Sequence, residues 1–197
     1  LRQALGIRRR LLPGTPVEAD TLISLADIVL QSGRPAEAQQ LGEQALALLS
    51  RLDSASDSYA ICLHTLAQIA YERHDFATAK QLVLRERRGR GGKPINALRQ
   101  ANSLLLLGEI AAARGDERAA RQHYSAMVDL LATYKQDSVQ MTDALKAWGE
   151  IELRTGHRQR AEELYGRAAD TLERQLRSIG GTEAQQLGFE ATYLPIY

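Results

Sequence analysis

The chain has 197 residues, of which 44% are hydrophobic, so it can bury a core and does not have the composition of a disordered segment. Its 25 lysine and arginine residues balance 24 acidic residues and leave a net charge of +1, which argues against a nucleic-acid-binding protein. A single cysteine, Cys62, excludes an internal disulfide, and no apolar run is long enough to span a membrane. We therefore expect a cytoplasmic protein without membrane contact.

Predicted helices follow one another along the whole chain. Residues 1–12 have the pattern of the second helix of a helix pair. Eight further helices are predicted at 17–32, 35–52, 57–73, 76–88, 95–114, 117–134, 138–155 and 158–178, and another from 182 to 194. All five prolines fall in loops or at helix starts, where a missing backbone N–H costs no hydrogen bond.

The short turns between paired helices recur at one interval. They begin at Gly33, His74, Gly115 and Gly156, so the spacing is 41 residues each time (74−33, 115−74, 156−115). Large residues recur eleven and eight positions before each turn: Leu22, Leu63, Leu104 and Leu145, then Leu25, Leu66, Leu107 and Trp148. Small residues recur seven positions before and five after it: Ala26, Ala67, Gly108 and Gly149, then Ala38, Ala79, Ala120 and Ala161.

These columns predict how the helices pack. Large residues three apart line one face of the first helix, and the small residues let its partner helix approach closely. One helix pair cannot bury its apolar stripe alone, so pairs stack on their neighbours. The sequence therefore predicts an all-α, right-handed superhelical α-solenoid of helix-turn-helix repeats with a 41-residue period.

The period also predicts the boundaries of the repeats. Residues 1–12 form the second helix of a truncated preceding repeat, and 180–197 start a further helix or a linker to a missing domain. Four repeats lie between these ends, at 13–56, 57–94, 95–137 and 138–179, and the second of them contains a basic, glycine-rich loop. Since the chain does not begin with Met and both ends break off within a repeat, we expect a fragment of a longer protein.

The large-x-x-large-small run, the Gly115-Asp116 turn and the aromatic residues Tyr124 and Tyr165 resemble the tetratricopeptide repeat (TPR) family. The 41-residue unit exceeds the family's common 34 and resembles the long repeats of kinesin light chain and of bacterial signalling proteins. The resemblance implies a protein-binding scaffold in a bacterial signalling protein. It also implies that repeat two, with His74 in place of Gly and Glu86 in place of a small residue, has a short and less well-packed second helix.

The C-terminal segment suggests an alternative role. Residues Leu187 to Tyr197 faintly resemble the helix that joins such repeats to a caspase-like CHAT protease in bacterial proteins. That resemblance implies a regulatory TPR arm of a larger enzyme.

The first helices should line the concave face, on which solenoids of this kind bind ligands. Positions thirteen, ten, six and three before each turn are predicted to project into this groove. Its predicted partner-binding residues are Asp20, Ile23, Asp27, Leu30, His64, Gln68, Tyr71, Asn102, Leu105, Glu109, Asp143, Lys146, Glu150 and Leu153, together with Ile61 and Ala112. Five of these are acidic and only Lys146 is cationic. The groove should therefore bind a peptide or protein segment that carries basic and apolar residues, unless this is simply a solvated face.

Other candidate sites have simpler interpretations. Cys62 and His64 are two residues apart on a helix, so they point in different directions and do not form a catalytic pair. Trp148 occupies a core column rather than a ligand platform. No histidine has the spacing of a metal site. We expect no enzyme activity, no cofactor and no metal.

The segment 85–93 is rich in arginine and glycine. It fails the phosphate-binding loop pattern because Arg87 stands at the first glycine position and Pro94 at the Ser/Thr position. A basic stretch can contact RNA, but no aromatic residues interleave here to stack on bases. We interpret the segment as a solvated loop between repeats.

Overall fold

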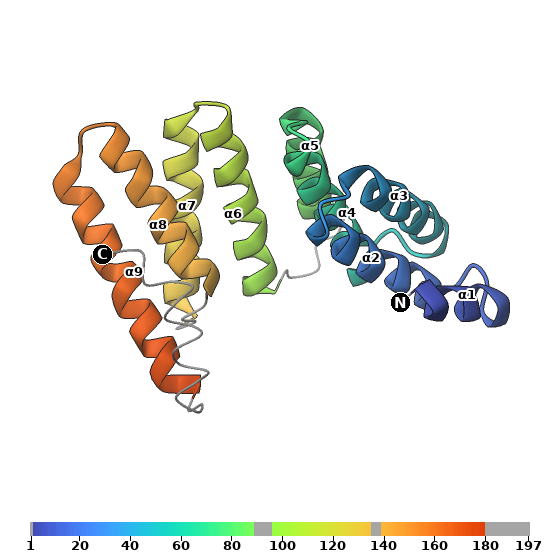
Figure 1. Cartoon of the computed structure of the whole chain (residues 1–197). Helices are drawn as coiled ribbons and strands as arrows, with labels where there is room; N and C mark the ends of the chain where they lie inside the picture. Colours follow the sequence, from blue (N-terminus) through green and yellow to red (C-terminus); the bar gives the residue numbers. More distant parts are fainter. Residues whose placement is uncertain (1, 89–95, 135–138, 180–197) are drawn as a thin grey trace. The chain divides into compact units, whose positions relative to one another are not determined.

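The computed structural model describes residues 2–88, 96–134 and 139–179, and within these ranges the secondary structure is entirely helical. The helices are α1 (Arg2–Leu11), α2 (Pro16–Gln31), α3 (Pro35–Leu52), α4 (Asp57–Glu72), α5 (Phe76–Arg88), α6 (Ala97–Ala113), α7 (Glu117–Thr133), α8 (Val139–Arg154) and α9 (Arg158–Ile179) (Figure 1). They agree with the predicted ranges to within two residues. The prediction of an all-helical chain is confirmed, whereas the helix expected at 182–194 lies outside the described residues.

The chain forms two compact units, Leu1–Ile95 and Asn96–Tyr197. In the first unit, α2 pairs with α3 and α4 with α5, while α3 and α2 both contact α4 and α1 packs on α2. The second unit repeats this arrangement with the pairs α6–α7 and α8–α9, joined by contacts of α8 with α7 and α6. Each unit therefore has two helix pairs stacked on each other, and each has its own hydrophobic core. The 41-residue period and the right-handed superhelix remain predictions.

The same hydrogen-bonded turn ends the first helix of every pair. Gly33, His74, Gly115 and Gly156 have φ between 60° and 83°, the left-handed conformation that lets a helix stop abruptly. At the first of these turns, the N–H of Arg34 donates to the carbonyl of Val29 at 3.1 Å, which satisfies a helix-end acceptor. His74 adopts this conformation despite its side chain, and its ring packs edge-on against Phe76 at 5.8 Å between centroids.

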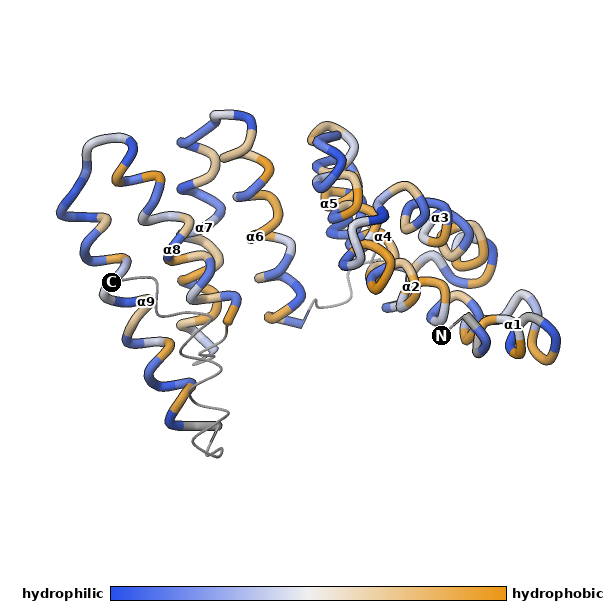
Figure 2. The backbone as a smooth tube through the Cα atoms, in the orientation of Figure 1, coloured by the Kyte–Doolittle hydropathy of each residue, from blue (hydrophilic) through white to orange (hydrophobic). Residues whose placement is uncertain are grey.

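Capping residues start the helices. The side chains of Ser56, Asn96 and Asp116 accept hydrogen bonds from backbone N–H groups in the first turns of α4, α6 and α7. Helices α2 and α3 begin instead with Pro16 and Pro35, whose fixed φ suits the first helical position. Hydrophobic and hydrophilic stretches alternate along each helix (Figure 2), so that one side of each can enter a core.

The predicted small residues lie where paired helices touch. All members of the two small-residue columns are buried: Ala26, Ala67, Gly108, Gly149, Ala38, Ala79, Ala120 and Ala161. Gly108 is in closest contact, because a Cβ added there would overlap the buried ring of Tyr124. A Cβ on Gly149 would come within 2.7 Å of the Tyr165 ring. The second unit therefore packs tyrosine rings of α7 and α9 directly on the glycine backbones of α6 and α8.

Repeat two differs from the other repeats as its sequence suggests. Helix α5 has 13 residues, compared with 17 or more in the second helices of repeats one, three and four. Glu86 is nevertheless only 2% exposed, and its Oε2 lies 3.2 Å from Nδ1 of His64 on α4. The carboxylate that replaces a small residue is therefore accommodated in an ion-pair geometry.

Replacing Gly108 with alanine should destabilise the second unit by about 1–3 kcal/mol, because the fully buried Tyr124 ring cannot move away from the added methyl group. Gly166→Ala is the matched control, since it adds a methyl group to an exposed site in α9 that nothing contacts within 4 Å. The control should gain about 0.5–1 kcal/mol from helix propensity. Urea unfolding followed by the fluorescence of the single tryptophan, Trp148, measures both. A Gly108→Ala variant as stable as the parent would contradict this packing.

Candidate functional site

The inner helices of the first unit, α2 and α4, contact each other and carry half of the predicted groove residues. Asp20 and Gln68 are exposed, while Asp27 and Leu30 are half-buried. Ile23 is only 4% exposed and belongs to the core of this unit, so it is unsuited to contact a ligand. Its burial corrects the predicted position, because the side chain packs within the hydrophobic core of this unit instead of facing a ligand.

Asp27 has an unusual electrostatic environment for an inner-face residue. Burial raises the pKa of its carboxyl group, while a hydrogen bond with Thr65 and the charge of His64 oppose the rise. The carboxylate is thus held close to α4 by two neighbouring residues of that helix. An acidic group is retained here although partial desolvation disfavours its charged form.

Cys62 and His64 do not form a reactive pair. The Cys62 side chain is buried, and its thiol lies 3.4 Å from the carbonyl oxygen of Gly42. Burial, assisted by the charge of Asp27, raises the pKa of the thiol to about 12, so it is not a thiolate at neutral pH. His64 is directed instead at Glu86 on α5.

The other inner-face residues of α4 include two large side chains. Tyr71 is half-buried, and its ring packs against Phe76 at 5.7 Å between centroids. Ile61 is 40% exposed. Both therefore present apolar surface beside Gln68.

The inner helices of the second unit are α6 and α8, which also contact each other. Their predicted groove residues are half-buried, apart from the exposed Glu150 and Leu153: Asn102, Leu105, Glu109, Ala112, Asp143 and Lys146. Burial raises the pKa of Asp143, and the charge of Lys146 opposes this rise. The charge of Glu150 adds to burial in raising the pKa of Tyr165.

The predicted acidic column is divided between the two units. Glu109 and Glu150 lie on the neighbouring helices α6 and α8, whereas Asp27 belongs to the first unit. Each unit separately carries carboxylates on its inner helices. A single row that joins all three remains a prediction.

Sequence reasoning missed a polar cluster in the second unit. Glu152 on α8 is buried, and its carboxylate lies 3.0 Å from both Nε of Arg121 and Nδ1 of His157. Trp148 donates from Nε1 to the same carboxylate at 2.8 Å, and the guanidinium of Arg160 lies 5.2 Å from the centre of its ring. Trp148 is only partly buried against the core, so its prediction as a plain core residue is incomplete. The signal was the tryptophan in a column that elsewhere holds leucine.

Further observations concern metal sites, membrane-spanning helices and the two segments singled out in the sequence. In the described ranges, no group of three His, Cys, Asp or Glu side chains could hold a metal ion. No helix in that part of the chain is long and apolar enough to cross a membrane. Of the basic segment 85–93, residues 85–88 form the end of α5, where the Arg85 guanidinium lies 5.5 Å from the centre of the Tyr59 ring. The rest of that segment, and the 187–197 segment that resembles a CHAT-protease linker, lie outside the described residues.

Comparison with known proteins supports the helix-pair architecture. Residues 18–88 match the tetratricopeptide repeat family, and no curated protein sequence matches. Nearly identical TPR-like repeats attributed to a kinesin light chain of Podosopora anserina superpose with a TM-score of 0.69 at 20% identity, covering 89% of this chain and 85% of theirs. BtubC (BKLC) from P. vanneervenii gives 0.70 at 19% identity, with coverage of 91% and 72%. MamA gives 0.63 at 17% identity, with coverage of 88% and 90%. The chain therefore has a tetratricopeptide-type fold similar to that of kinesin light chain repeats, and residues 18–88 carry the family's sequence signature.

Proposed function

We propose that the inner faces of this chain bind a segment of another protein that alternates basic and apolar residues, and that the chain acts as a scaffold or sensor within a larger protein. The observation that carries this proposal is the presence of acidic side chains on the inner helices at positions where burial disfavours their charged form. Asp27 and Asp143 are both half-buried carboxyl groups with raised pKa values. Titratable groups whose pKa values are shifted by burial cluster at functional sites, which supports a binding role for the inner faces.

The distribution of charge supports a cationic ligand. Five acidic residues and one lysine occupy the predicted inner positions, although the whole chain carries a net charge of only +1. Lys146 partly offsets Asp143, and His64 is paired with Glu86. The remaining negative potential should accelerate encounter with lysine or arginine residues and disfavour acidic segments.

Apolar side chains beside these carboxylates should provide most of the affinity. Leu30 and Tyr71 are half-buried on the inner helices of the first unit, as Leu105 is in the second. Leu153, on α8, is 52% exposed. Burying such side chains against an apolar partner residue is the main source of binding energy in peptide grooves. A role in cytoplasmic signalling in a bacterium remains a prediction from the sequence resemblance.

Replacing Asp27 with asparagine should stabilise the protein at neutral pH. A carboxyl group with a raised pKa binds its proton more tightly in the folded state, so its ionisation costs stability above that pKa. The amide removes this cost and can still accept the hydrogen bond of Thr65. The gain should shrink as the pH falls and vanish below the ordinary pKa of 3.8, where both states are protonated. Urea unfolding across this pH range measures it, with the exposed Asp20→Asn on the same helix as control. A gain that does not depend on pH would contradict the assignment.

Reversing exposed inner-face charges tests the binding proposal directly. The double variant Asp20→Lys, Glu150→Lys changes one exposed carboxylate in each unit. We expect it to weaken binding of a fluorescein-labelled peptide that alternates lysine with leucine by about tenfold at low salt, and far less at high salt, because salt screens exposed charges. Fluorescence anisotropy titrations give the affinities.

The control carries the same change in net charge on the second helices. Asp129→Lys, Asp170→Lys alters exposed residues of α7 and α9 and should leave the affinity close to that of the parent. Equal weakening by both double variants would show that the peptide responds only to net charge. Unchanged affinity in the inner-face variant would exclude these faces as the binding site.

A further inference from the structure

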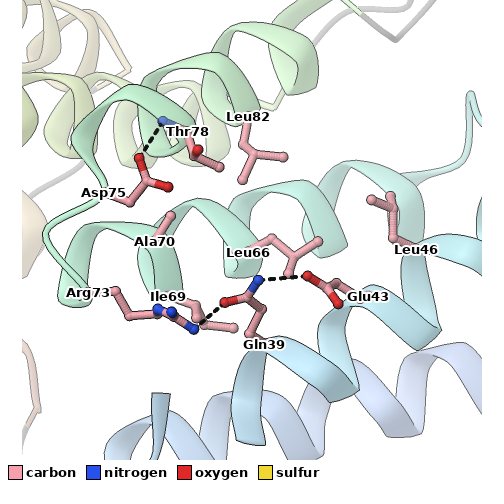
Figure 3. A pocket seen from close by; sticks show the side chains of 10 residues that line it. All are labelled: Gln39, Glu43, Leu46, Leu66, Ile69, Ala70, Arg73, Asp75, Thr78 and Leu82. Carbon is pink, nitrogen blue, oxygen red and sulfur yellow. Dashed lines mark hydrogen bonds between the residues drawn. The ribbon is translucent and has the colours of Figure 1, made fainter. Parts of the chain in front are cut away.

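A pocket of about 300 Å³ lies in the first unit between the second helices α3 and α5, with α4 beneath it (Figure 3). Its floor is apolar and consists mainly of Leu66, Ile69 and Ala70 of α4, all buried. The residues that line it come from α3, α4, α5 and the turn between α4 and α5, and none belongs to the proposed peptide-binding set. The pocket is therefore a separate site from the inner face.

Two carboxylates lie at opposite walls of this pocket. Glu43 of α3 accepts a hydrogen bond from Gln39 at 2.7 Å, and Asp75 lies in the turn before α5. Asp75 accepts the N–H of Thr78, and its pKa is lowered chiefly by its hydrogen bonds with that residue. One cation, Arg73, also lines the pocket, and its guanidinium donates to the Gln39 side chain. The walls thus combine two acidic groups with one arginine.

The second unit shows what occupies the corresponding place there. The left-handed turn residues His74 and Gly156 are 82 positions apart (156−74), and they align the pair α4–α5 with α8–α9. The same offset relates the pocket residues Leu66, Ala70, Thr78, Gln39 and Asp75 to Trp148, Glu152, Arg160, Arg121 and His157. These five residues form the polar cluster around Trp148 described above.

The two units therefore fill the equivalent space between their second helices with different side chains. In the second unit, the Trp148 ring lies under the Arg160 guanidinium and donates to a carboxylate that Arg121 and His157 also contact. In the first unit, leucine, alanine and threonine replace the tryptophan, the glutamate and the stacked arginine. Smaller side chains leave a cavity in which the tryptophan ring and the arginine stacked on it have no counterpart, while Glu43 and Asp75 lie at the walls where the second unit has Ser125 and His157.

We propose that the pocket between α3 and α5 binds an aromatic side chain of a partner protein segment, with an adjacent lysine or arginine of that segment at Glu43 and Asp75. The ring would pack on Leu66 and Ala70, as an apolar floor requires. The cation would complement the two carboxylates. The bound segment would thereby provide an aromatic ring and a cation. In the second unit, Trp148 and Arg160 provide these groups.

The probe is the short peptide acetyl-Gly-Trp-Lys-Gly-amide, titrated into the full 197-residue chain labelled with ¹⁵N. Backbone amide shifts in two-dimensional NMR spectra report where it binds. We expect saturable shifts concentrated at residues 39–46 and 66–82, with millimolar affinity for so small a ligand. A peptide with alanine in place of tryptophan, or glutamate in place of lysine, should bind about tenfold more weakly.

Two protein variants locate the site. Thr78→Arg places an arginine at the exposed position that corresponds to Arg160, where it should cover the pocket and lower the affinity by about tenfold. Glu43→Lys should do the same by reversing one wall charge at an exposed residue. The matched control, Arg160→Thr, changes the second unit and should leave the shifts in the first unit as they are.

Four results would overturn the proposal. One is the lack of saturable shifts at the pocket residues with the tryptophan–lysine peptide. Another is an affinity for the alanine-containing peptide equal to that for the tryptophan–lysine peptide. The third is shifts confined to inner-face residues such as Asp27 and Tyr71, which would support the proposed function while excluding this second site. An unchanged affinity in both Thr78→Arg and Glu43→Lys would likewise exclude the pocket.

Discussion

The close approach of paired helices at small residues is the constraint on which the rest of this structure depends. Alanine or glycine stands at every such contact, from Ala26 and Ala38 in the first pair to Gly149 and Ala161 in the last, and all are buried. Because the backbones are so close, the large residues one and four positions before the small residue of each first helix can fill the space between stacked pairs. The inner faces, the pocket between α3 and α5, and the cluster around Trp148 all lie on helices that pack through these contacts.

Both proposed binding sites result from how each unit uses its polar residues. Inner-face carboxylates such as Asp27 are partly desolvated, so their ionisation reduces stability, and in the proposed site their charge would serve recognition. In the second unit, Arg121, His157 and Trp148 all contact the buried Glu152, which closes that site internally. The first unit keeps its carboxylates at the pocket walls, where a partner can reach them.

Sequence periodicity predicted the helices, the positions of the turns between paired helices and the columns of small residues at the helix contacts, because these depend on local residue spacing. It could not predict that Ile23 is buried, since burial depends on how the helices of the unit pack together and not on residue spacing alone. The pocket and the Trp148 cluster were also missed. Both depend on the combined size of side chains from three helices, and a column-by-column alignment compares positions singly. The sequence signal was nevertheless present, as leucine and alanine in one repeat and tryptophan and glutamate in another.

A double-mutant cycle on Gly108 and Tyr124 tests the central claim about helix approach most directly. It compares the free energy of unfolding of the parent, Gly108→Ala, Tyr124→Leu and the combined variant, measured in urea. If the tyrosine ring rests on the glycine backbone, the added methyl group should be destabilising only when the ring is present. The account predicts a coupling energy of about 1–3 kcal/mol, with alanine tolerated at position 108 beside leucine. Additive effects of the two substitutions would contradict it.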